Sequence, residues 1–110
     1  MKKIFYPADR HELRTDEQTG ALYWAVNTKN LMFTYFEVPP NKTFEKHTHE
    51  SEQMTYVLSG SLFFDVEGEI YRVGPGDLIS ISSFKEHSVW TEAEGAKAID
   101  TWSPVNKKYL

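Results

Sequence analysis

Residues 54–82 read MTYVLSGSLFFDVEGEIYRVGPGDLISIS, in which short runs rich in aromatic and branched residues alternate with tight turns. The runs are Met54–Leu58, Leu62–Val66, Glu69–Val73 and Leu78–Ser82. Ser59-Gly60 and Glu67-Gly68 separate the first three runs, the latter with glycine where a hairpin needs a positive φ. Gly74-Pro75-Gly76-Asp77 is another sharp turn. This pattern predicts consecutive antiparallel strands.

The sequence on either side continues the pattern. Five further strands are predicted at Ala21–Val26, Leu31–Val38, Phe44–His49, His87–Glu92 and Ala96–Trp102. Asn27–Asn30 is a predicted turn, and Ala8–Gln18 has room for one or two helical turns. No segment carries an amphipathic pattern long enough for a helix of about 10 residues. About nine short strands at this spacing predict an all-β sandwich or barrel.

Composition restricts the class of protein. A chain of 110 residues is predicted to form one domain spanning 1–110, and 40% hydrophobic residues are enough for a core. The absence of cysteine excludes disulfides, Fe–S clusters and thiolate zinc sites. The net charge of −4 argues against nucleic acid as the main partner. No apolar run has the length of a membrane span, and the residues after Met1-Lys2-Lys3 do not resemble a secretory signal, so a cytoplasmic protein is expected.

Histidines suggest a metal site. His47 and His49 are two residues apart, and in a strand such residues point to one face, so both imidazoles can converge on one ion. Gln53 offers an amide oxygen as a further ligand, whereas Glu52 has the opposite parity in a straight strand. His87 would join them from a strand paired nearby. Zinc, nickel, iron, copper and manganese all accept imidazole, so the spacing leaves the metal open. The remaining histidine, His11, is predicted to be a solvated surface residue.

Two segments of the sequence, residues 41–60 and 76–91, resemble the two motifs of the cupin superfamily. The first motif has matching spacing at Asn41, His47, His49, Gln53 and Gly60, and the second at Gly76, Ser82, Phe84, His87 and Thr91. Several motif positions depart in residue type, among them Asn41 and Phe84 in place of glycine and Ser82 in place of proline. Asn tolerates left-handed backbone, but the loop before His87 must turn by other means.

The resemblance implies a fold and a cofactor. It implies a single-domain cupin, a double-stranded β-helix or jelly-roll barrel, with one divalent metal ion per chain held by His47, His49, Gln53 and His87. Because Gln53 stands where most cupins have Glu, a divalent site would carry a formal charge of about +2 rather than +1, which favours Lewis-acid chemistry and an anionic partner. Cupins are commonly homodimers, and the resemblance implies the same here.

A second resemblance concerns the C-terminal strand. The chain resembles the pectin-degradation cupins, which linearise 4,5-unsaturated monouronates. The resemblance is carried by Glu52-Gln53, Tyr56–Gly60, Gly76-Asp77, His87 and Asp100–Pro104. In that family the aspartate is followed two residues later by Phe and six residues later by Arg, where this chain has Trp102 and Asn106. Lys107 or Lys108 could take the place of the arginine, although lysine lacks its bidentate geometry.

These patterns lead to a functional hypothesis. Asp100 and Trp102 share one face of a strand; if that face is internal, Asp100 can act as acid or base and Trp102 can stack against a substrate ring. Otherwise Asp100 is a surface charge and Trp102 a core residue. We predict a metal-dependent isomerase or lyase that acts on a small sugar acid. The alternatives are a dioxygenase or polyketide-cyclase-like cupin, and a non-catalytic sensory cupin.

Overall fold

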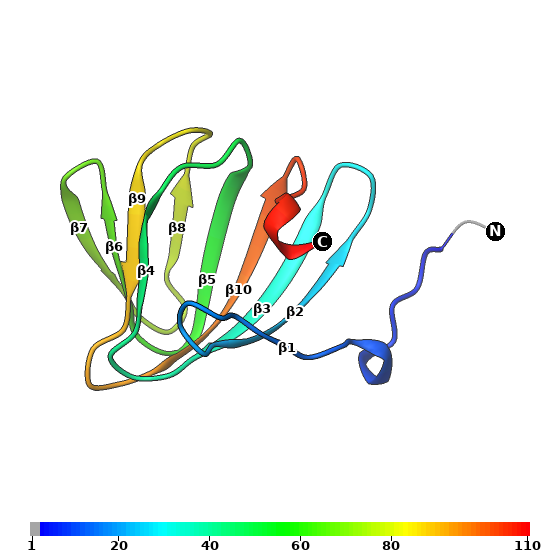
Figure 1. The fold of residues 1–110 in the computed structure, drawn as a ribbon, viewed down its shortest axis with the longest axis horizontal. Coiled ribbons are helices and arrows are strands. Elements are labelled where there is room, and N and C mark those ends of the chain that lie inside the picture. The colour runs from blue at the N-terminus through cyan, green and yellow to red at the C-terminus, as the bar shows by residue number, and fades with distance from the viewer. Residues whose placement is uncertain (1–2) are drawn as a thin grey trace.

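The computed structural model describes residues 3–110; Met1 and Lys2, part of the segment examined for a secretory signal, lie outside the described residues. Ten strands form two antiparallel sheets (Figure 1). The six-stranded sheet has the order β1-β2-β3-β10-β5-β8, and the four-stranded sheet β4-β9-β6-β7. The strands are β1 (Arg14–Thr15), β2 (Leu22–Asn27), β3 (Met32–Val38), β4 (Thr43–His47), β5 (Glu52–Gly60), β6 (Leu62–Val66), β7 (Glu69–Val73), β8 (Leu78–Ile81), β9 (His87–Trp90) and β10 (Ala96–Ser103). Two single turns of 3-10 helix, η1 (Ala8–Arg10) and η2 (Lys107–Tyr109), lie near the two ends of the chain. The all-β jelly-roll fold predicted from the sequence is confirmed.

The core lies between the two sheets and follows a two-residue alternation. In β5, Gln53, Thr55 and Val57 are buried while the residues between them are exposed. In β10, Ala98, Asp100 and Trp102 are buried in the same way. Because β5 and β10 pair as neighbours, with Thr55 opposite Asp100, their polar inward residues meet in one place. The core itself is built from residues that include Phe36, Val57, Phe64, Ile81 and Trp102.

The predicted strands and turns are largely present, with three differences. The segment Ala8–Gln18 holds only the short η1 turn and the two-residue strand β1, which the sequence pattern did not predict. The strand predicted over Phe44–His49 ends at His47, because residues 48–51 cross from the four-stranded to the six-stranded sheet. Asn41 and Phe84, the two residues standing in for glycine, both adopt left-handed backbone, with φ of 56° and 63°. The loop before His87 therefore keeps the backbone turn of a glycine although Phe84 carries a side chain.

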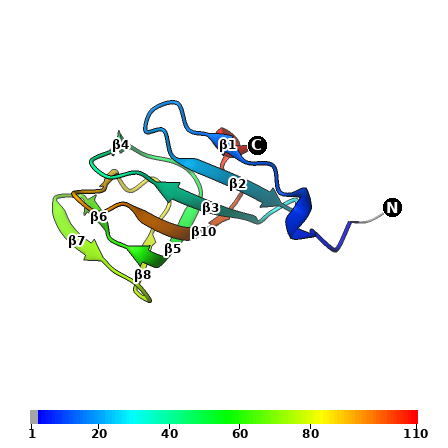
Figure 2. The same cartoon turned by 90° about the horizontal axis from the view of Figure 1, so that it is seen from below.

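The two chain ends differ in how they contact the fold. Residues 3–7, before η1, extend away from the sheets, as both views show (Figures 1 and 2). The carboxyl-terminal turn η2 folds back beside β1, where Arg14 donates hydrogen bonds to its carbonyls. Within residues 3–110 there is no helix with the length and apolarity needed to cross a membrane.

Candidate metal centre

Three histidines come together at one end of the space between the sheets. One ring nitrogen from each of His47, His49 and His87 lies within 4.8 Å of the others. His47 and His87 are opposite each other in the β4–β9 pair, with ring centroids 4.3 Å apart. His49 lies beyond the end of β4, in the loop that crosses to β5, and its ring centroid is 4.8 Å from that of His87. The convergence predicted for His47 and His49 is present, but the crossing loop produces it rather than alternation along a strand.

The backbone fixes which nitrogen of each ring is free. In each case Nδ1 lies against the carbonyl oxygen of a residue two positions away: His47 against Glu45 (2.6 Å), His49 against Ser51 (2.8 Å) and His87 against Lys85 (2.8 Å). A neutral imidazole has one donor and one acceptor nitrogen, so an Nδ1–H donor leaves Nε2 as the acceptor. This is the arrangement that orients histidine ligands in metal sites.

Gln53 adds an oxygen to the cluster. Its amide nitrogen donates to Thr55 Oγ1 at 2.9 Å and to Asp100 Oδ1 at 3.4 Å, which leaves the amide oxygen directed at His49. That oxygen lies 3.0 Å from His49 Nε2. Because His49 donates its Nδ1–H to the Ser51 carbonyl, its Nε2 and the Gln53 amide oxygen are both acceptors. A cation bound by both atoms would satisfy their lone pairs. Glu52 points the other way and is exposed, in agreement with the parity argument.

The electrostatics favour neutral imidazoles. Burial, together with the neighbouring His47 and His49, lowers the pKa of His87 to about 4, although the hydrogen bond to the Lys85 carbonyl opposes the shift. Burial also lowers the pKa of His47, against a raising effect from its bond to the Glu45 carbonyl. Only a neutral imidazole has a free lone pair, so these shifts hold His47 and His87 in the form that binds a metal. Three imidazole nitrogens and one amide oxygen are a donor set that fits a divalent transition metal.

Asp100 lies directly behind Gln53. Its Oδ1 accepts from the Thr55 hydroxyl and the Gln53 amide, and its Oδ2 accepts from Thr34 Oγ1 at 3.3 Å. Trp102 Nε1 in turn donates to Thr34 Oγ1 at 2.9 Å. Burial raises the pKa of Asp100 to about 6, although these hydrogen bonds oppose the shift. Asp100 is therefore internal and not a surface charge, and it helps to orient the Gln53 amide.

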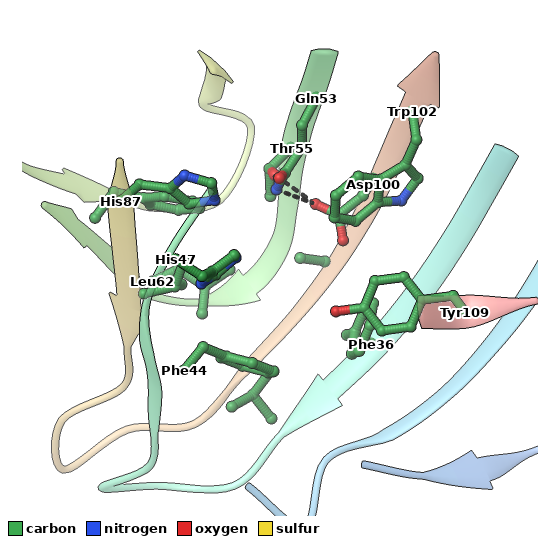
Figure 3. A pocket seen from close by; sticks show the side chains of 14 residues that line it. Phe36, Phe44, His47, Gln53, Thr55, Leu62, His87, Asp100, Trp102 and Tyr109 are labelled. Atoms are coloured by element: carbon green, nitrogen blue, oxygen red, sulfur yellow. Dashed lines mark hydrogen bonds between the residues drawn. The ribbon is translucent and has the colours of Figure 1, made fainter. Parts of the chain in front are cut away.

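A cavity leads from His47 and His87 into the interior (Figure 3). Counting the open space at its mouth it spans about 470 Å³, of which about 50 Å³ can hold the centres of water molecules, room for a few waters. Its polar lining is His47, Gln53, Thr55, His87 and Asp100, and its apolar lining is Phe36, Val38, Phe44, Leu62, Phe64, Val89 and Ala98, with Trp102 and Tyr109 at the side. Trp102 is thus a buried core residue that also lines the cavity. Sequence reasoning missed Tyr109, since no local pattern distinguishes an aromatic residue next to the end of the chain.

Neither Asn106, at the position of the family arginine, nor its neighbours Lys107 and Lys108 line the cavity. The side chain of Asn106 caps η2 by accepting from the backbone N–H of Lys108 at 3.1 Å. Lys108 Nζ lies 3.7 Å from Asp16 Oδ1, and Lys107 is exposed. No lysine or arginine is among the described residues that line the cavity.

One prediction about a histidine is wrong. His11 was expected to be a solvated surface residue, but it is half-buried, with its ring 4.2 Å from that of Trp24. Its Nε2 is buried with no hydrogen-bond partner among residues 3–110. The polar sequence around His11 did not reveal that the amino-terminal segment packs on an aromatic side chain of β2. His11 stands apart from the three clustered histidines.

Comparison with known proteins agrees with this geometry. The family model for the cupin domain matches residues 34–102, so the chain belongs to the cupin family. The structure is similar to that of KdgF from Halomonas sp., with 25% identity and a TM-score of 0.85 over 99% of this chain and all of that one. It also matches an RmlC-like cupin from Shewanella frigidimarina, with 22% identity and a TM-score of 0.86 over 99% and 97% of the two chains. The polyketide cyclase RemF from Streptomyces resistomycificus matches with 24% identity and a TM-score of 0.76 over 97% and 82%. The curated proteins yield no match.

Proposed function

We propose that this cupin is a metal-dependent enzyme that uses Lewis-acid chemistry as an isomerase or lyase on a small sugar acid, such as an unsaturated uronate. The observation that carries the proposal is the uncharged donor set of His47, His49, Gln53 and His87, with the carboxylate of Asp100 bonded to Gln53. A divalent ion bound there supplies polarisation of a substrate carbonyl. The formal charge of about +2 left by four neutral ligands favours an anionic substrate.

The residues around this site have distinct roles in the proposal. Asp100 lines the cavity and holds or accepts the proton that moves at the substrate, because it is the carboxylate among the lining residues. Trp102 lies edge-on to His49 at a centroid distance of 5.3 Å and presents an aromatic surface to the cavity for stacking. Thr34 and Thr55 keep the Asp100 side chain in place through hydrogen bonds to its two oxygens.

Two measurements on untagged protein test the proposal. Elemental analysis is expected to find one divalent metal ion per chain, and a 4,5-unsaturated monouronate is expected to be linearised, with loss of its conjugated double bond. A protein that holds stoichiometric metal but leaves this substrate unchanged contradicts the sugar-acid assignment. A protein that binds no divalent metal contradicts the whole proposal. Cytoplasmic location stays a prediction from the sequence.

A second candidate is a polyketide-cyclase-like activity. The observation that favours it is the apolar half of the cavity, where Phe36, Phe44, Leu62 and Phe64 form a surface suited to a flat, weakly polar substrate. Binding of aromatic β-diketones in preference to uronates would support this candidate.

A further inference from the structure

Tyr109 is buried although it lies after the last strand, in the single turn η2. It is 7% exposed. Its ring packs against those of Tyr23, Phe36 and Trp102, each with a centroid separation of 5.4 Å. The carboxyl-terminal turn η2 thereby supplies one wall of the cavity.

Several polar contacts hold this wall in place. Arg14 donates to the Tyr109 carbonyl oxygen at 2.7 Å and to the Leu110 carbonyl oxygen at 3.2 Å, and its guanidinium lies 4.9 Å above the Tyr23 ring. Lys108 pairs with Asp16, which is itself buried. The asparagine cap on η2 adds a further bond. The position of Tyr109 is therefore set by residues far away in the sequence and not by its own turn alone.

The Tyr109 hydroxyl points into the cavity, toward the space between Phe44 and Asp100 (Figure 3). None of the side-chain hydrogen bonds found among residues 3–110 uses it, and it is not one of the fully enclosed polar atoms, so it faces the cavity's open space. Buried tyrosine hydroxyls usually have a partner. Burial and the nearby Asp100 carboxylate raise the pKa of Tyr109, which keeps the hydroxyl protonated and able to donate.

We infer that Tyr109 is a substrate-contacting residue, whose hydroxyl donates a hydrogen bond to an oxygen of the bound molecule at the end remote from the three histidines. This inference rests on the proposed function, because it requires a substrate with an oxygen that binds the metal at one end and an oxygen that accepts a hydrogen bond at the other. It assigns to the carboxyl-terminal turn a part in specificity, since a molecule without an acceptor at its remote end leaves this hydroxyl unpaired.

The test compares two probes on zinc-loaded protein by titration calorimetry. Kojic acid, a hydroxypyranone that chelates divalent metals, is of monosaccharide size and carries oxygens at its far end; formate can occupy only the metal end. The variant Tyr109→Phe keeps the packed ring and removes the hydroxyl. It is expected to bind kojic acid about 10-fold more weakly than wild type, as loss of one hydrogen bond predicts, and formate equally well.

Tyr23→Phe is the matched control, because Tyr23 belongs to the same aromatic cluster but does not line the cavity. It is expected to bind both probes as wild type does. Equal binding of kojic acid by Tyr109→Phe and wild type overturns the inference. The inference is also overturned if the wild-type protein binds formate but not kojic acid. Turnover of the unsaturated uronate is measured separately, so a protein inactive on that substrate but sensitive to Tyr109→Phe in the kojic acid titration loses the sugar-acid assignment and keeps the role of Tyr109.

Discussion

In the proposed metal site, the neutral amide of Gln53 determines the formal charge of the loaded site and links the site to Asp100. Gln53→Glu keeps a ligand oxygen in place but lowers the formal charge of the loaded site from about +2 to +1. Metal is expected to bind at least as tightly, while Lewis-acid turnover falls by about tenfold or more. The measurements are metal content after dialysis and the rate on the unsaturated uronate.

The structure adds a control that the sequence did not suggest. Gln53→Glu also removes the N–H that Asp100 accepts and sets two carboxylates side by side. Combining Gln53→Glu with Asp100→Asn restores a donor between the two side chains. If the tight metal binding of Gln53→Glu persists in the double variant, the effect comes from the charge on the ligand. An unchanged rate in Gln53→Glu shows that site charge does not control the reaction.

Asp100 is expected to matter for turnover and little for metal retention. Asp100→Asn removes the group proposed to handle the proton, and loss of a general acid or base typically costs about 10²–10⁴-fold in rate. Metal content, measured by elemental analysis, is expected to stay stoichiometric. Asp65→Asn is the matched control, because Asp65 is half-buried and accepts a hydrogen bond from the Gly68 N–H but does not line the cavity. An Asp100→Asn enzyme as fast as wild type removes Asp100 from the mechanism.

In the proposed metal site, His47, His49 and His87 are ligands and His11 is not. His87→Ala is expected to lower metal occupancy strongly, because it removes the buried ligand that contacts both other rings. His11→Ala is expected to leave metal occupancy unchanged, although it removes packing against Trp24. Elemental analysis of purified variants distinguishes the two. Full metal content in a His47→Ala/His49→Ala double variant contradicts this ligand set.

At the scale of strands and loops, local sequence patterns predicted which residues are internal, but they did not predict contacts between segments distant in the sequence. Alternation identified Asp100 and Trp102 as candidates in β10, whereas Gln53 was proposed from its spacing after His49 and from the cupin motif. All three are internal because period-two burial holds along β5 and β10. The strand predicted through His49 failed at its end, where the chain has to change sheets. The position of Tyr109 depends on Arg14, 95 residues away, and no local pattern encodes such a contact.

The link between β1 and η2 leads to a prediction about the carboxyl-terminal turn. Arg14→Ala removes two hydrogen bonds to the carbonyls of Tyr109 and Leu110. We expect faster amide hydrogen exchange in residues 107–110 and weaker kojic acid binding, with metal content unchanged. Arg10→Ala, in η1, is the control, because Arg10 is exposed and its side chain makes no hydrogen bond or ion pair within residues 3–110. Unchanged exchange at residues 107–110 in Arg14→Ala shows that packing of the Tyr109 ring alone holds the turn.

At the scale of the whole molecule, the outer face of the six-stranded sheet is unusually apolar. Its exposed side chains include Phe33, Met54, Tyr56, Leu58 and Leu78, which are between 39% and 59% exposed. Part of this set is continuous across neighbouring strands, because Tyr56 is paired with Leu78 on one side and with Ile99 on the other. Apolar patches that extend across a sheet mark interaction surfaces. The homodimer predicted from the sequence therefore has a candidate interface, and a second copy of this chain is the proposed occupant because identical faces pair by two-fold symmetry.

Sedimentation equilibrium tests this interface directly. Wild type is expected to sediment at micromolar concentration with twice the 12.8 kDa mass of the chain. Tyr56→Lys places a charge near the centre of the apolar face, where a buried unpaired charge strongly disfavours association, and is expected to shift the protein to monomer. Ile70→Lys is the matched control, because Ile70 is 66% exposed on β7 of the other sheet and its charge stays in water. A wild-type monomer contradicts the homodimer, and a Tyr56→Lys dimer assigns the interface to another surface, such as the extended amino-terminal segment with its exposed Ile4 and Phe5.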